Sequence, residues 1–153
     1  EPTKSAVVPD LNIAWSNKCV VRVNKMVLER KKGARFPMPD TLDKHWAGVK
    51  WDVVVGQPLY IAQATNGIAA SKNEMVRVKY VDNDTIYLED GIGKVARSDF
   101  WKVLRPAYCT TTHKAQGDTF AVDFGIWEWD RMDEELRYTA ITRAKSLGQI
   151  KFH

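Results

Sequence analysis

The sequence predicts an α/β domain that is interrupted by a small antiparallel β module. Residues 11–33 read as a buried strand followed by a helix, and strand and helix alternate again after Pro106. Between these parts, residues 53–96 contain short runs of β-type residues that are separated by Asn-Gly, Asp-Asn and Asp-Gly turn signals. Short strands at this spacing are typical of an antiparallel barrel and not of βα units.

The length and composition allow this architecture. A chain of 153 residues with 44% hydrophobic residues is long enough for one domain with a real core that carries a small insertion. We expect residues 1–54 and 105–153 to form one discontinuous domain and residues 55–104 to form the inserted barrel. The net charge of +4 points mildly towards a polyanionic partner such as nucleic acid.

The sequence carries no signal for secretion, a membrane span or a metal site. Cys19 and Cys109 are far apart, which suggests neither a disulfide framework nor a zinc site. No apolar run approaches the roughly 20 residues of a membrane span, and the first residues lack a signal-peptide pattern. We therefore expect an intracellular protein of the cytoplasm, the nucleus or a viral replication site, with no membrane partner. Because the sequence begins at Glu1, we interpret it as a fragment.

The first α/β segment begins with an apolar strand at residues 11–15. Ser16 follows as a helix N-cap, and apolar residues recur at helical spacing until Gly33. The charge run at residues 29–32 reads as a solvated helix end or, alternatively, as a contact for a nucleic-acid backbone. For residues 34–52 we expect an irregular, partly ordered connection.

The second α/β segment follows the barrel. We expect strands at residues 107–112, 121–127 and 149–152, and a helix that Asp130 caps and that runs to about Ala144. The spacing of the apolar residues on this helix predicts that one side faces the sheet, namely Met132, Leu136 and Ala140.

Two stretches of this segment concentrate hydroxyls, amides and cations. They are residues 108–120 and residues 138–145, and Arg143 is predicted to lean from the sheet edge into a cleft. This residue set suits phosphate, which needs backbone N–H groups, small side chains and a fixed cation. Neither stretch pairs a nucleophile with a base, so covalent chemistry is the weaker interpretation.

The same stretches carry a family resemblance. Residues 111–117 read TTHKAQG and resemble the T-x-H-K-x-Q-G motif V of superfamily 1 helicases, and residues 138–144, YTAITRA, resemble their motif VI. The segment IAWSNK at residues 13–18, with Asn24 after it, is similar to the motif IV region. The order of the motifs is kept, and the resemblance covers most of residues 11–152.

The position of the β module narrows the resemblance. In the RecD-like and Pif-like branch, which moves 5′ to 3′, the C-terminal UvrD-type motor domain carries an SH3-like barrel between motifs IV and V. The resemblance therefore implies a RecA-like second motor domain of the P-loop NTPase fold, with an inserted SH3-like antiparallel β-barrel. It implies an ATP-dependent DNA helicase of replication or repair that acts on single-stranded or fork DNA.

The sequence also lacks part of such an enzyme. It contains no G-x-x-x-x-G-K-[ST] loop and no Asp-Glu pair after an apolar strand. ATP and Mg²⁺ are therefore implied for the full-length protein, held mainly by an N-terminal RecA-like domain that would be the partner of this chain. We expect the fragment alone to be inactive.

The resemblance assigns roles to residues of the ATP cleft. Arg143 would be the arginine finger, whereas its ordinary alternative is an ion pair with Asp133 or Glu135. Three residues of the motif V loop would also face ATP, and the glycine among them is alternatively a plain turn residue; the three are Gln116, Gly117 and Asp118.

Six further residues would contact nucleic acid through hydroxyls, amides and cations, which hold phosphates without reading the base sequence. They are Asn17, Lys18, Thr111, Thr112, His113 and Lys114. Helix capping is the alternative for the first two residues, and a structural role is the alternative for His113. Trp127 and Trp129 would stack on bases or complete a core, and the same alternatives hold for Trp46, Trp51 and Trp101.

Two other functions remain compatible with the sequence. In the first, the β module is the working part of a non-catalytic nucleic-acid or protein-binding module, and the α/β part is its scaffold. In the second, the chain belongs to an RNA helicase with similar motifs.

Overall fold

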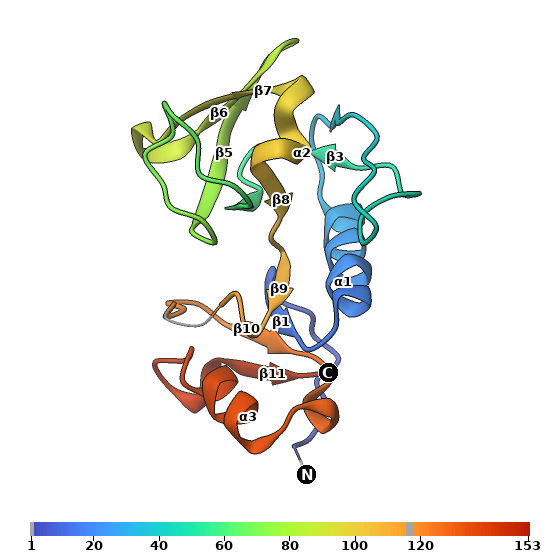
Figure 1. The fold of residues 1–153 in the computed structure, drawn as a ribbon. Helices are drawn as coiled ribbons and strands as arrows, with labels where there is room; N and C mark the ends of the chain where they lie inside the picture. Colours follow the sequence, from blue (N-terminus) through green and yellow to red (C-terminus); the bar gives the residue numbers. More distant parts are fainter. Residues whose placement is uncertain (1, 116–117) are drawn as a thin grey trace. The chain divides into compact units, whose positions relative to one another are not determined.

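A computed structural model describes residues 2–115 and 118–153 (Figure 1). The chain divides into two compact units, and each has its own sheet. Unit 1 contains the chain up to Val27 together with Tyr108–His153, and unit 2 is Leu28–Ala107. The expected boundaries of the insertion, at residues 55 and 104, stay a prediction.

Unit 1 is built on a four-stranded parallel sheet of β1 (Leu11–Ala14), β9 (Cys109–Thr111), β10 (Phe124–Ile126) and β11 (Ile150–Phe152). The strand order is β11-β10-β1-β9. All four strands fall within segments that the sequence predicts as strands. Because the strands are parallel, their carboxyl ends meet at one edge, where open α/β sheets bind ligands.

Helix α1 (Asn17–Arg30) follows β1 directly. Ser16 caps it as predicted, since its Oγ accepts a hydrogen bond from the backbone N–H of Cys19 at 3.2 Å. Val20 and Val23 are buried on the inner side of the helix. Of the described helices, α1 is the longest with 14 residues, and none is long and apolar enough to cross a membrane.

Helix α3 (Glu134–Ile141) is shorter than the sequence predicts. The prediction that Asp130 caps it is wrong: Asp130 lies in a 3₁₀ turn, and Asp133 is the N-cap, with its side chain accepting from the Leu136 N–H at 2.7 Å. Glu128 precedes this turn in a left-handed conformation (φ 61°), and the helix begins only at Glu134. The predicted inner side is confirmed, since its apolar residues are buried, namely Met132, Leu136 and Ala140.

Unit 2 contains a five-stranded antiparallel sheet that curls into a half-barrel, which confirms the predicted β module. Its strand order is β7-β6-β5-β4-β8, and a short helix α2 (Phe100–Val103) precedes β8. The strands are β4 (Pro58–Ile61), β5 (Met75–Val81), β6 (Thr85–Leu88), β7 (Gly93–Ala96) and β8 (Leu104–Pro106).

The segment before the half-barrel is more ordered than the sequence predicts. Strands β2 (Phe36–Pro37) and β3 (Asp52–Val53) form an antiparallel pair. Between them, the rings of Trp46 and Trp51 pack edge to face with centroids 5.2 Å apart, and both side chains are buried. The ring centroid of Trp101 lies 6.0 Å from that of Trp46. The three tryptophans therefore pack together in the fold, which is the second of the two roles considered for them.

Candidate functional site

The structure brings the two stretches that are rich in hydroxyls, amides and cations together in unit 1. Arg143 Nη1 donates to the carbonyl of Ala115 at 3.1 Å, and the backbone N–H of Phe120 donates to the carbonyl of Arg143 at 2.8 Å. Phe120 and Ala144 also form an isolated parallel bridge. The loop after β9 and the segment after α3 are therefore direct neighbours, although about 30 residues of sequence separate them.

Arg143 is half-buried and its guanidinium has a fixed orientation. Nε donates to the carbonyl of Thr139 at 3.0 Å, and Nη2 donates to Thr142 Oγ1 at 3.1 Å. Every acceptor described for Arg143 is thus a carbonyl or hydroxyl oxygen, and none is a carboxylate. The cation is held by neutral groups, so its charge is not neutralised by its described partners.

The residues of the loop that are predicted to face ATP follow Ala115 directly in the sequence. Gln116 and Gly117 lie outside the described residues. Asp118 is exposed, and its backbone N–H donates to the Ala115 carbonyl at 3.1 Å. Ala115 therefore accepts hydrogen bonds both from its own loop and from Arg143.

The loop from Thr111 to Lys114 forms a tight turn at the carboxyl end of β9. Thr111 Oγ1 accepts from the Lys114 N–H at 3.3 Å. Thr112 is fully buried, and its hydroxyl and N–H both point to the Ala14 carbonyl, at 3.3 and 2.9 Å. The side chain of Thr112 thus anchors the loop to β1 and is turned away from solvent, whereas His113 is exposed.

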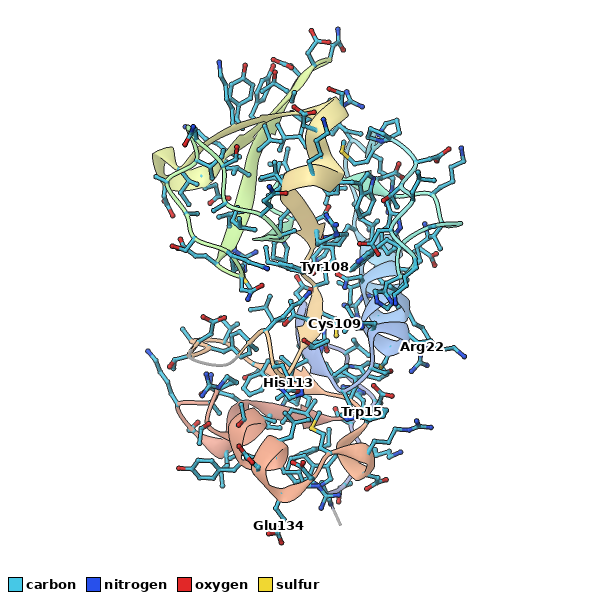
Figure 2. All side chains as sticks on the ribbon, viewed as in Figure 1. Trp15, Arg22, Tyr108, Cys109, His113 and Glu134 are labelled. Atoms are coloured by element: carbon cyan, nitrogen blue, oxygen red, sulfur yellow. The ribbon has the colours of Figure 1, made fainter. Side chains whose placement is uncertain are left out.

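A cavity of about 440 Å³ lies beside this loop in unit 1. Its wall includes His113, Trp15 at the end of β1, and Arg131, whose guanidinium lies 5.7 Å from the Trp15 ring centroid. Figure 2 labels Trp15 and His113 on the same unit. Trp15 is 43% exposed, and neither it nor Arg131 was among the predicted site residues. The available signal was an aromatic residue directly after a buried strand.

A carboxylate lies at the N-terminus of α1, where Asn17 and Lys18 were expected to contact nucleic acid or to cap the helix. Asn17 and Lys18 are exposed there, but the N–H of Ser16 donates to Glu128 Oε1 at 2.8 Å and its hydroxyl donates to the same atom at 2.9 Å. A carboxylate near this helix end gains from the helix dipole as a phosphate would. Glu128 therefore already occupies part of the anion-binding position at this helix end, where Asn17 and Lys18 were expected to contact nucleic acid.

Trp127 forms part of the wall of a second cavity in unit 1, of about 330 Å³. Its Nε1 donates to the buried Asn12 Oδ1 at 2.9 Å, and its ring stacks on His153 with centroids 4.5 Å apart. A Cβ at Gly125 would clash with Asn12 Oδ1, so this arrangement requires glycine there. Burial lowers the pKa of His153. The half-buried Trp127 is thus held by its neighbours in the fold.

Neither cysteine is suited to act as a nucleophile. Cys19 and Cys109 are both buried free thiols. Burial raises the pKa of Cys19, and it raises the pKa of Cys109 well above its usual range. Because the thiolate is the reactive form, burial makes both thiols poor nucleophiles. Among the described residues, no group of His, Cys, Asp and Glu is arranged to hold a metal ion.

Comparison with solved structures gives the fold a precedent. A structure of two coordinating Pif1 helicases at forked duplex DNA matches 97% of this chain with a TM-score of 0.69 and 15% identity. Pif1 helicase from Bacteroides in complex with ADP-AlF3 and single-stranded DNA matches 99% with a TM-score of 0.65 and 15% identity. Pif1 helicase from Candida albicans matches 99% with a TM-score of 0.58 and 16% identity.

The match covers only part of each relative. This chain corresponds to 40% of the first chain, 42% of the Bacteroides chain and 46% of the Candida chain. No protein-family model matches the sequence, and no curated protein matches it significantly. At 14–16% identity the likeness concerns the fold. The chain has the fold of part of a Pif1 helicase: a parallel α/β sheet with an inserted, curled antiparallel half-barrel.

Proposed function

We propose that this chain is the second motor domain of an ATP-dependent superfamily 1 DNA helicase, which translocates on single-stranded DNA from 5′ to 3′ and unwinds duplex DNA. The observation that carries the proposal is the fold likeness to Pif1 helicase over 97% of the chain. The contact between Arg143 and Ala115 adds support, because it joins the motif V-like and motif VI-like segments in one place.

In this proposal Arg143 is the arginine finger. ATP, held together with Mg²⁺ mainly by a first RecA-like domain, would supply the phosphoryl group that is transferred to water. The guanidinium of Arg143 stabilises the negative charge that develops on that group. Its bonds to Thr139, Ala115 and Thr142 orient the planar fork in advance, and the remaining N–H groups of the fork suit phosphate oxygens.

The loop after β9 has a second role in this proposal. Thr111, His113 and Lys114 contact the phosphates of a single strand, and Gln116, Gly117 and Asp118 face ATP. Thr112 fixes the loop to β1 from inside. One short loop between both ligands gives a physical link between the state of ATP and the affinity for the strand. A movement of Ala115 would affect both the residues that contact the strand and the residues that face ATP.

The full-length protein tests this function by strand displacement. With ATP and Mg²⁺, we expect it to unwind a DNA duplex with a 5′ single-stranded tail and not one with a 3′ tail. Unwinding of only the 3′-tailed duplex would contradict the polarity. Preference for matched RNA duplexes would make the chain part of an RNA helicase, and absence of ATP-dependent unwinding on every substrate would refute the motor function.

A further inference from the structure

The half-barrel of unit 2 carries an unusual outer surface. Tyr80 on β5 lies opposite Tyr87 on β6, and Tyr87 lies opposite Lys94 on β7, so the three residues form a row across the strands. Arg77 and Lys79 are exposed on β5 beside this row. We call these five residues the tyrosine face.

A β-bulge creates part of this face. The pairing of β5 with β6 shifts register between Val78 and Tyr80, so Lys79 and Tyr80 are both exposed. Regular alternation would send one of two consecutive residues into the core. The bulge therefore presents a cation and an aromatic ring side by side on the same surface.

The Tyr80 ring is accessible, and it packs beside the Tyr87 ring. Tyr80 is 56% exposed although its ring is apolar, and its centroid lies 5.6 Å from that of Tyr87 at an interplanar angle of 39°. The hydroxyl of Tyr87 donates to Asp82 Oδ2 at 3.2 Å, which fixes the ring. A planar ligand that stacks on Tyr80 therefore meets a platform that loses little side-chain entropy.

The charge of the face favours an anionic ligand. Within the described strands β5, β6 and β7 there is no Asp or Glu, whereas Arg77, Lys79 and Lys94 are all exposed. Asp82, whose carboxylate contacts the face at Tyr87, is also engaged by the backbone N–H groups of Asp84 and Thr85. Exposed aromatic rings between cations are the pattern by which proteins bind single strands, stacking bases and neutralising phosphates.

We propose that the tyrosine face binds single-stranded nucleic acid without sequence preference, with a base stacked on Tyr80 and phosphates paired with Lys79 and Lys94. The inference rests on the proposed function and deepens it, because it gives the inserted half-barrel a strand contact of its own. An acidic peptide would use the cations but would gain little from the exposed ring of Tyr80, so nucleic acid fits the face better.

Oligonucleotide binding by the 153-residue chain tests the proposal. Anisotropy of a fluorescein-labelled oligo-dT at several salt concentrations gives affinity and salt dependence. Tyr80→Ala should weaken binding by about fivefold or more with an unchanged salt slope, whereas Tyr80→Phe should bind as the wild type. Replacing Lys79 and Lys94 together by Ala should lower the salt slope by about 1.4, since each phosphate contact on a single strand contributes about 0.7.

The control is Lys72→Ala, which removes an exposed lysine of the same unit outside the face and should leave binding unchanged. The proposal is overturned if the wild-type chain does not bind oligo-dT, if the face variants bind like the wild type, or if poly-glutamate competes as well as oligo-dT does. If those variants bind normally while the full-length protein unwinds DNA, only the face is refuted. If they lose binding while no unwinding occurs, only the motor function is refuted.

Discussion

At the scale of single residues, buried polar side chains hold the candidate site in place. Asn24 is fully buried, and its Nδ2 donates to the carbonyls of Val20 and Cys109 at 2.9 and 2.8 Å. Its Oδ1 accepts from the Cys109 N–H at 3.2 Å. The amide therefore acts like a strand neighbour for Cys109 and joins α1 to the edge strand β9, which leads into the loop with Thr111.

Removing this amide should destabilise unit 1. Asn24→Ala leaves the N–H and the carbonyl of Cys109 buried without that partner, at a cost of roughly 1–3 kcal/mol for each unsatisfied group. Urea unfolding of the chain measures the loss. Glu29→Ala on the exposed side of the same helix serves as the control. An unfolding free energy for Asn24→Ala within about 0.5 kcal/mol of the wild type would contradict this role.

At the scale of elements, local patterns predicted most of the structure. The four strands of the parallel sheet, strands β4 to β7 of the half-barrel and the cap at Ser16 followed from apolar runs and turn residues, whereas β8 was not predicted. The start of α3 did not, because Asp130 and Asp133 are equally good caps in the sequence. The choice depends on the left-handed Glu128, whose carboxylate is bound by Ser16, 112 residues away in the sequence. Such a contact leaves no local signal.

The two aspartates at α3 provide a matched pair of variants. Asp133→Ala removes the acceptor of the Leu136 N–H and should lower the unfolding free energy by about 1 kcal/mol. Asp130→Ala removes an exposed carboxylate of the same charge and should cost clearly less. Urea unfolding of both variants compares them directly. An equal loss in both would show that charge near the helix, and not the cap, is responsible.

The turn between β5 and β6 gives a prediction for pH. Hydrogen bonds from the backbone N–H groups of Asp84 and Thr85, and from the Tyr87 hydroxyl, lower the pKa of Asp82. Because the folded pKa lies below the unfolded one, Asp82 stabilises the fold fully above the unfolded pKa. That contribution is lost as the pH falls through the folded pKa.

The corresponding experiment compares the wild type with Asp82→Asn by urea unfolding from about pH 7 down to about pH 2. The wild type should lose more stability than the variant as the medium becomes acidic, so the two curves should converge at low pH. Parallel curves would show that the Asp82 carboxylate does not contribute to the acid sensitivity of the fold.

At the scale of the whole molecule, the order of motifs and the inserted β module were sufficient to predict an α/β fold with a half-barrel. The details of the site depended on contacts across the sequence. Three features of the site are formed by segments that are far apart in the chain. They are the hydrogen bond between Arg143 and Ala115, the buried position of Thr112 and the cavity with Trp15. The chain spans about 40% of the Pif1 chains it matches, so its proposed ATP cleft is half of a site.

ATP hydrolysis by the full-length protein is the most direct test of the central claim. With single-stranded DNA present, Arg143→Ala should lower the hydrolysis rate by about 10³-fold or more, because an arginine finger contributes that much. Arg137→Ala, in the preceding helix α3, is the control, since this arginine packs on the Trp129 ring and should leave the rate close to wild type. Near-wild-type hydrolysis by Arg143→Ala would contradict the account.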